Sequence, residues 1–215
     1  MLQLYTYFRS SAAYRVRIAL HLKGLAYQSM PVHLLRDGGE QLREDYRALN
    51  PAALVPTLKD GELVLTQSLA ILEYLEETRP AVPLLPADAV SRARVRALAL
   101  TIACDIHPVN NLRVLKYLSD TLEVDGEARV AWYRHWIELG LGTLEQLLTP
   151  AAGTGRFCHG DTPGLADCCL VPQVFNANRF QVDMAPYPTV LRIAKECAGL
   201  DAFIAAHPEQ QPDAE

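Results

Sequence analysis

The strongest constraint on the fold is a strand that runs directly into a helix at the start of the chain. Apolar and polar side chains alternate over residues 2–7, and apolar residues recur at helical spacing over 12–20, before Gly24. Ser10 and Ser11 stand where the strand gives way to the helix. Free N–H groups and the positive end of the helix dipole meet there, so the point suits an anion. A serine hydroxyl either caps the helix or holds a thiolate, and because the stretch contains no cysteine, such a thiolate has to come from another molecule.

The composition limits the classes of partner. A formal net charge of −5 over 215 residues argues against a surface for nucleic acid or anionic membranes. No apolar run approaches the roughly 18 to 20 residues of a membrane span, and residues 1–4 lead straight into a strand, so we expect no signal peptide. The 5 cysteines are an odd number without zinc-ligand or Cys-x-x-Cys spacing. We therefore expect a reduced, cytoplasmic protein that binds no metal, nucleic acid or membrane.

Strands and helices alternate through the first part of the chain. The elements expected after the first helix are a strand at 27–34, a helix at 40–49, a strand opened by Pro56, a hairpin at Asp60-Gly61 and a helix from Ser68. Pro31 favours an edge position for the second strand, because proline cannot donate to a ladder. Ser68 can cap the last helix. The order β-α-β-α-β-β-α is the thioredoxin-like layout.

The rest of the chain has a helical pattern. Residues 79–86 are rich in proline, end the preceding helix and read as a linker. Helices are expected from residue 88, over 127–148, after 160–167 and over 187–197. The polar tail 207–215 is expected to be mobile at its end.

Residues 9–20 carry a family resemblance. Their sequence, RSSAAYRVRIAL, resembles the signature Ser-Ser-Cys-x-x-Arg-Val-Arg-Ile-Ala-Leu of zeta-class glutathione transferases, and the resemblance extends over nearly the whole chain. It implies the glutathione transferase fold, α/β plus all-α. A thioredoxin-like glutathione-binding domain would span residues 1–79, a linker 80–87 and an all-helical substrate-site domain 88–215. The resemblance also suggests a homodimer.

The resemblance assigns the chemistry to the first helix start. Ser10 is the residue that it matches to activation of the glutathione sulfur, and the share taken by Ser11 is left open. Arg9 lies beside the expected thiolate. Ala12 stands where the signature has cysteine. Because glutathione supplies the nucleophile, we expect isomerisation to survive this difference and side reactions with haloacids to change.

The same resemblance completes a glutathione site. Pro56 matches the family's cis-proline, and Val55 before it would pair its backbone with the tripeptide. Gln67 and Ser68 match the pair that holds the γ-glutamyl end, with the carboxylate on the serine and helix amides. Two anion sites at helix starts, with Val-Pro between them, are a more specific combination than either alone.

A polar segment interrupts the helical region at Pro108, which should kink the helix. His107, Asn110 and Asn111 fall at i, i+3 and i+4, so a helix would place them on one face. The resemblance assigns the segment to the domain interface. We expect the three side chains to meet glutathione or a partner subunit, and the sequence does not separate the two.

Three arginines are the candidates for substrate binding. Arg9, Arg113 and Arg179 match arginines that zeta-type isomerases place around the active site. Guanidinium groups pair in bidentate fashion with carboxylates, and the maleyl substrates are dicarboxylates. Arg15 and Arg17 are interpreted as structural. Asp167, three residues after Gly164, resembles half of the family's capping box and is assigned no chemistry.

Several activities compete. The first is glutathione-dependent cis-trans isomerisation of maleylacetoacetate in tyrosine and phenylalanine catabolism, by reversible thiolate addition, because residues 106–115 look most like that group. Maleylpyruvate isomerisation in gentisate degradation and transferase activity on haloacids are the alternatives. A non-catalytic binding module is disfavoured, since the serine, the Gln-Ser pair and the three arginines are all present.

Overall fold

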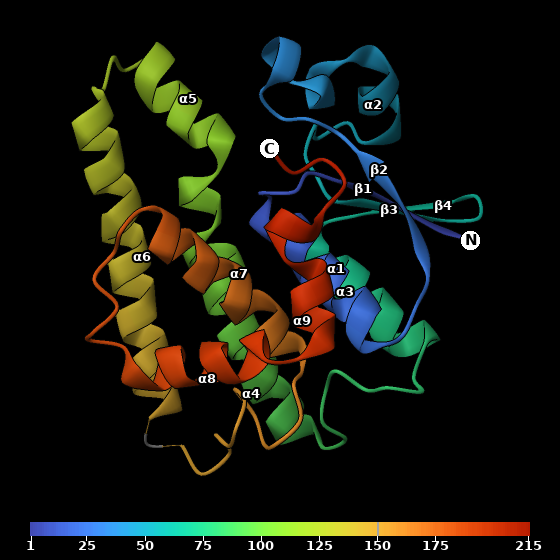
Figure 1. Ribbon diagram of the computed structural model, residues 1–215, viewed down its shortest axis with the longest axis vertical. Helices are drawn as coiled ribbons and strands as arrows, with labels where there is room; N and C mark the ends of the chain where they lie inside the picture. The colour runs from blue at the N-terminus through green and yellow to red at the C-terminus, as the bar shows by residue number, and fades with distance from the viewer. Residues whose placement is uncertain (150) are drawn as a thin grey trace. The chain divides into compact units, whose positions relative to one another are not determined.

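The computed structural model describes residues 1–149 and 151–215 (Figure 1). Contacts divide the chain into two units. The first comprises residues 1–84 together with 199–215, and the second comprises residues 85–198. Within the described residues, no helix is long and apolar enough to cross a membrane.

The first unit contains the predicted four-stranded sheet. Its strands are β1 Leu2–Thr6, β2 Tyr27–Pro31, β3 Thr57–Asp60 and β4 Leu63–Thr66. The order is β2-β1-β3-β4, with β1 parallel to β2 and the other pairs antiparallel. The predicted edge position of β2 is confirmed, and Pro31 ends that strand. Gly61 turns the hairpin at φ +61°, a backbone conformation that favours glycine.

Helices cover both faces of this sheet. Alternation along β1 sends Leu4 to one face and Tyr5 to the other. On the Leu4 side, α1 Ser11–Leu22 and α3 Ser68–Thr78 pack side by side (Figure 1). On the Tyr5 side, Tyr46 of α2 Glu44–Leu49 joins a buried apolar cluster. Short 3-10 turns at Arg36–Gly38 and Glu40–Leu42 lead into α2.

The end of the chain returns to the first unit. The sequence interpretation grouped residues 199–215 with the helical region, whereas in the structure α9 Asp201–Ala206 packs on α1. The 3-10 turn Pro208–Gln210 follows, and the backbone N–H of Phe8 donates to Asp213 Oδ2 at 2.9 Å. The polar tail, expected from its local sequence to be mobile at its end, thus makes hydrogen bonds to residues far away in sequence.

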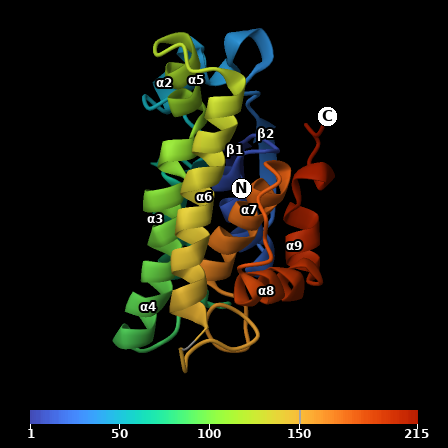
Figure 2. The same ribbon diagram turned by 90° about the vertical axis from the view of Figure 1, so that its left-hand side faces the viewer.

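The second unit is helical. Its helices are α4 Ala89–Leu100, α5 Leu112–Asp120, α6 Gly126–Leu148, α7 Leu165–Arg179 and α8 Pro188–Ala198. Helix α7 packs against α4 and α8, and α6 packs against α8 (Figure 2). Gly140 lets α6 approach Ile106, because a Cβ there would lie 2.2 Å from that side chain. The half capping box is confirmed, since Asp167 accepts from Gly164 N at 2.8 Å. The expected arrangement is therefore present: a thioredoxin-like sheet with helices, then a helical region.

Candidate active site

Ser10 is the N-cap of α1. Its backbone is extended, with φ −70° and ψ 115°, and its Oγ accepts from Ala13 N at 3.2 Å. A serine oxygen that accepts this bond still has its own hydrogen to donate. Capping the helix and holding an anion are therefore compatible roles for one hydroxyl. Ser11 is only 5% exposed, so the half-buried Ser10 is the more accessible of the two serines.

Aromatic side chains fix Arg9 in the same turn. Its guanidinium carbon lies 4.9 Å from the centre of the Phe8 ring, and Nη2 donates to the Tyr7 hydroxyl at 3.0 Å. Both contacts hold the guanidinium close to the turn that carries Ser10. Arg9 therefore supplies a positive charge whose position is restrained.

Arg17 holds the backbone of this turn from inside the unit. It is fully buried, and its guanidinium donates to Tyr7 O at 3.3 Å and to Phe8 O at 2.9 Å. It also donates to Thr6 Oγ1 at 3.0 Å. Burial lowers the pKa of Arg17 to about 10, which leaves the group charged at neutral pH. The structural role expected for Arg17 is therefore to support the candidate site.

The start of α3 is built differently. Gln67 occupies the N-cap with φ 69° and ψ 116° and makes no side-chain cap. Ser68 is the first helical residue, so the prediction that it caps α3 is wrong. Instead, Ser68 Oγ accepts from Arg15 Nη1 at 3.2 Å, and both side chains are buried. A buried guanidinium thus adds positive charge to a helix start that already favours an anion. Non-glycine residues in such strained backbone cluster at ligand sites.

Val55 precedes a cis peptide bond to Pro56, which confirms the expected isomer. Val55 is 8% exposed, and its backbone makes no hydrogen bond within the described part of the chain. The loop is held by its neighbour, because Leu54 O accepts from Tyr46 Oη and from Asn50 Nδ2, both at 2.7 Å. A rigid loop with buried, unpaired backbone groups suits an extended peptide. These groups fit the backbone of glutathione.

In the second unit, the segment around Pro108 does not form the expected kinked helix. A π-helix spans Thr101–Ile106 and a 3-10 turn spans Pro108–Asn110. Asn111 has extended backbone, with φ −65° and ψ 148°, and caps α5 by accepting from Arg113 N. The prediction that His107, Asn110 and Asn111 share one helical face is therefore wrong, because the 3-10 turn ends at Asn110 and Asn111 is extended.

Asn110 and Arg179 nevertheless meet around one aromatic pair. The rings of Tyr133 and Phe180 stack with centres 3.6 Å apart, and the Arg179 guanidinium lies 5.2 Å from the Phe180 ring. Asn110 Nδ2 donates to Tyr133 O at 3.1 Å, and its buried Oδ1 has no hydrogen-bond partner within residues 1–149 and 151–215. Burial raises the pKa of Tyr133 to about 12, although Arg179 opposes the rise. Arg113 is exposed on α5 and does not join this group.

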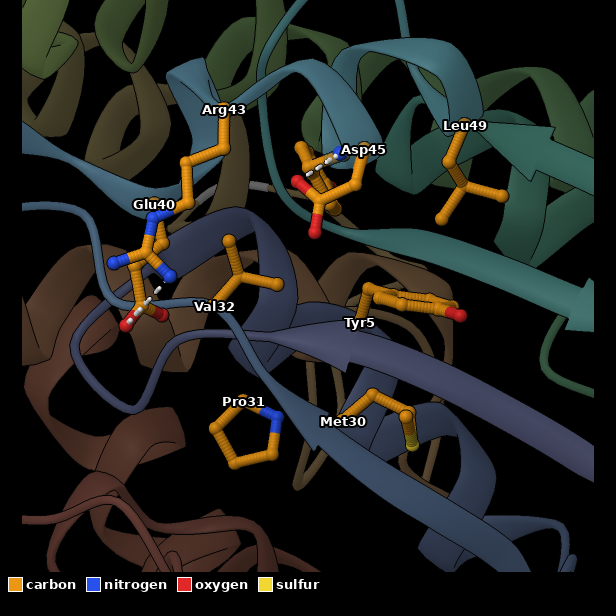
Figure 3. Close-up of a pocket in the computed structure, with 9 residues that line it drawn as sticks. Tyr5, Met30, Pro31, Val32, Glu40, Arg43, Asp45 and Leu49 are labelled. Atoms are coloured by element: carbon orange, nitrogen blue, oxygen red, sulfur yellow. Dashed lines mark hydrogen bonds and ion pairs between the residues drawn. The ribbon is translucent and has the colours of Figure 1, made fainter.

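A cavity of about 390 Å³ lies elsewhere in the first unit (Figure 3). Its lining comes from β1, β2 and the segment of the 3-10 turn and α2: Tyr5, Met30, Pro31, Val32, Glu40, Arg43, Asp45, Tyr46 and Leu49. None of these is a predicted site residue. In the part of the chain that the structure describes, no cluster of three or more His, Cys, Asp or Glu side chains could hold a metal ion.

Sequence reasoning missed the supporting side chains. Arg15 and Arg17 were interpreted as structural, yet Arg15 reaches the start of α3 and Arg17 reaches the turn before α1. The available signal was the placement of two arginines in a helix whose other residues over 11–20 are mostly apolar.

Comparison with known proteins defines the family. Residues 9–78 match the glutathione S-transferase N-terminal domain. A probable maleylacetoacetate isomerase of Vibrio cholerae is 56% identical over 211 residues, 98% of this chain and 97% of that protein. The holo structure of a maleylpyruvate isomerase, described as a bacterial zeta-class glutathione transferase, is 50% identical with a TM-score of 0.96, covering 99% of this chain and 100% of that one.

A second solved structure contains ligands. The maleylacetoacetate isomerase of Methylobacterium extorquens AM1, with bound malonate and glutathione, is 48% identical with a TM-score of 0.95, and 99% of each chain is covered. Identity at this level over almost the full length of both chains is far more than a shared fold. The chain belongs to the zeta-class glutathione transferase family, among its maleylacetoacetate and maleylpyruvate isomerases.

Proposed function

We propose that this protein is a glutathione-dependent cis-trans isomerase that converts maleylacetoacetate into fumarylacetoacetate. The observation that carries the proposal is the start of α1. There, the accessible hydroxyl of Ser10 and the restrained charge of Arg9 share a turn that contains no cysteine. Because this turn can hold a thiolate but contains no thiol of its own, another molecule has to supply the sulfur. When bound, glutathione supplies the thiolate that adds reversibly to the substrate double bond and so allows rotation.

The residues of the first unit bind and activate this group. Ser10 donates its hydroxyl hydrogen to the sulfur, and the first N–H groups of α1 add their dipoles, so that the thiolate is favoured over the thiol. The unpaired backbone of Val55 pairs with the peptide. Ser68, with Arg15 behind it, and Gln67 hold the γ-glutamyl end. Ser11 supports the turn as a buried neighbour.

Arginines hold the substrate. Arg9, Arg113 and Arg179 are proposed to bind its carboxylates and the negative charge that moves onto its carbonyl oxygen. Two supports are the aromatic contacts that restrain Arg9 and Arg179. His107, Asn110 and Asn111 are proposed to contact glutathione or a partner subunit. The unpaired Oδ1 of Asn110 leaves one acceptor for that purpose.

Maleylpyruvate is the second candidate substrate, because a maleylpyruvate isomerase is 50% identical with a TM-score of 0.96. The two substrates share the maleyl head and differ in the acyl tail. We further propose that the protein is cytoplasmic, which the 5 free cysteines support. We also propose that it is a homodimer, which the family membership supports. Sedimentation at micromolar concentration tests the dimer through the mass of the particle.

The decisive experiment follows isomerisation of both substrates side by side, with and without glutathione. Turnover that requires glutathione is expected for at least one, and the ratio of the two kcat/KM values identifies the physiological reaction. Turnover that is equal without glutathione would contradict the mechanism. Glutathione binding without turnover of either substrate would favour a transferase or binding role.

A further inference from the structure

We propose that Asp213 is a positioning residue for the thiolate site, and that residues 207–215 hold the Ser10 turn in its active geometry. This inference rests on the proposed function, because it concerns the same sulfur. The segment is the end of the chain, and it lies in the same unit as the turn. Its role is to fix backbone, without touching the substrate.

The turn itself is short and determined by few bonds. Ser10 N donates to Tyr7 O at 2.9 Å, which closes residues 7–10. Arg17 holds the carbonyl groups of Tyr7 and Phe8. The N–H of Phe8, in the first peptide of the turn, donates to Asp213 Oδ2 at 2.9 Å. Arg17 therefore binds the Phe8 carbonyl oxygen, and Asp213 binds the Phe8 N–H.

Asp213 is also coupled to Arg17 through charge. Its Oδ1 is buried and has no hydrogen-bond partner in residues 1–149 and 151–215. Burial lowers the pKa of Arg17, and the nearby Asp213 carboxylate opposes that lowering. The attraction between the two charges therefore offsets part of the free-energy cost of burying the guanidinium. Arg17 Nε in turn donates to Ala206 O at 3.0 Å, at the end of α9. One arginine thus links the turn to the segment that delivers Asp213.

Contacts on both sides of Asp213 fix the segment. Before it, Gln211 Nε2 donates to Ala205 O and His207 O. After it, Glu215 Oε1 lies 3.1 Å from His33 Nε2 and 2.9 Å from Arg36 Nη2. His33 is held in turn by its own loop, because its Nδ1 accepts from the N–H groups of Leu35 and Arg36.

A small displacement of this turn has a large chemical consequence. The Ser10 hydroxyl must stay in line with the sulfur, and misplacement by about 1 Å can cost roughly 10²-fold in rate. Losing the acceptor for Phe8 N removes one charge-assisted hydrogen bond and leaves a donor without its partner. The turn then moves or loosens, and the bound thiol becomes less acidic.

The test compares the wild type with Asp213→Ala, Asp213→Asn and Glu209→Ala. The pKa of the bound glutathione thiol is read from thiolate absorbance against pH, and kcat and KM are measured in parallel. Asp213→Ala is expected to raise the thiol pKa by about half a unit to one unit and to lower kcat about tenfold, with a smaller change in KM. Asp213→Asn keeps an acceptor and should recover more than half of both changes. Glu209, whose side chain is 81% exposed in the same segment, is the matched control and should change neither.

The outcomes separate the two proposals. A wild type without glutathione-dependent turnover contradicts the proposed function. If the wild type is active and Asp213→Ala lowers the melting temperature while thiol pKa and kcat stay normal, the positioning role is wrong. If Asp213→Ala does not fold, Asp213→Glu displaces the acceptor by one methylene and keeps the charge. A thiol pKa equal to that of the wild type in that variant overturns the inference.

Discussion

The starts of α1 and α8 use the same chemistry in opposite ways. At α8, the chain supplies its own anion: Glu145 of α6 accepts from Thr189 N and Val190 N, both at 3.0 Å. At α1, the cap is a neutral hydroxyl, because Ser10 Oγ accepts from Ala13 N at 3.2 Å. An occupied helix start contributes to stability, whereas an open one is available to a ligand. The difference supports the proposal that the start of α1 binds the thiolate, whereas the start of α8 already holds a carboxylate of the chain.

The start of α3 stands between these cases. Ser68 accepts from a buried arginine, and Gln67 holds strained backbone at φ 69°. Positive charge is thus assembled at a helix start that has no side-chain cap among the described residues. The strained backbone of Gln67 and the buried charge of Arg15 both lower the stability of the fold. Both features are explained if this helix start binds a carboxylate.

Ser10→Ala should give the largest effect. The variant removes the donor to the sulfur, so kcat/KM for isomerisation is expected to fall about 10²- to 10³-fold, as when one oxyanion donor is lost. Loss of the cap should also cost about 1 kcal/mol of unfolding free energy. Steady-state kinetics and urea unfolding measure the two effects.

Ser11→Ala is the matched control for that variant. Its serine is buried beside Ser10 and makes no contact assigned to the sulfur, so less than a tenfold loss is expected. If Ser11→Ala were the more damaging change, the assignment of the thiolate to Ser10 would be reversed.

Ser68→Ala should act on binding more than on turnover. The hydroxyl is proposed to hold a glutathione carboxylate, and a hydrogen bond to a charged group contributes about 1.5–3 kcal/mol. The glutathione Kd is therefore expected to rise at least about tenfold, with kcat at saturating glutathione nearly unchanged. Calorimetric titration and kinetics distinguish this from the Ser10 variant. A fall in kcat with an unchanged Kd would place Ser68 in the chemical step instead.

The sequence predicted the parts of this comparison that depend on local pattern. The helix start at Ser10 and the edge position of the second strand follow from alternation and proline chemistry, although that strand was expected over 27–34 and ends at Pro31. The half capping box at Asp167 was placed by resemblance. Val55-Pro56 was placed by resemblance. These features involve neighbours within a few residues, so periodicity and composition contain them.

The sequence did not predict contacts between distant residues. Nothing in the pattern around Ser68 indicates that Arg15, 53 positions away, donates to it. The tail was expected to be mobile because it is polar, and its partner Phe8 N, 205 positions away, is not visible in the local pattern. The π-helix at Thr101–Ile106 likewise replaced the regular helix expected from spacing. Tertiary packing decides these features, and a single sequence does not display it.

Gln67→Gly separates strain from side-chain contact at the α3 start. Glycine adopts positive φ without a steric penalty, so the variant is expected to raise the unfolding free energy by about 1 kcal/mol. Gln67→Ala loses the same side chain and keeps the strain, so its stability should stay near that of the wild type. Both should weaken glutathione binding equally if the side chain contacts the ligand. Urea unfolding with a glutathione titration measures both quantities, and equal stability of the two variants would exclude strain at this position.

Glu145→Gln should have the smallest effect, on stability alone. Partial burial alone would raise the pKa of Glu145, but the hydrogen bonds from Thr189, Val190 and Thr149 outweigh it, and the pKa lies below its ordinary value. A carboxyl group whose pKa is lower in the folded state stabilises the fold at any pH above its pKa in the unfolded chain, near 4.5. This stabilisation is lost as the pH falls through the pKa of the folded state. At pH 7 the variant should lose about 1 kcal/mol or less, because the carboxylate is partly exposed.

The difference between the wild type and this variant should therefore shrink as pH falls from 7 to 4, in urea unfolding followed at each pH. Glu138→Gln, exposed on the same helix, is the control and should show no such convergence. A Glu145 difference that stayed constant with pH would mean that packing, and not the carboxylate on the helix start, stabilises α8. The start of α8 would then no longer be an example of a helix start stabilised by a carboxylate of the chain. The proposed anion site at α1 would have to be supported by glutathione binding alone.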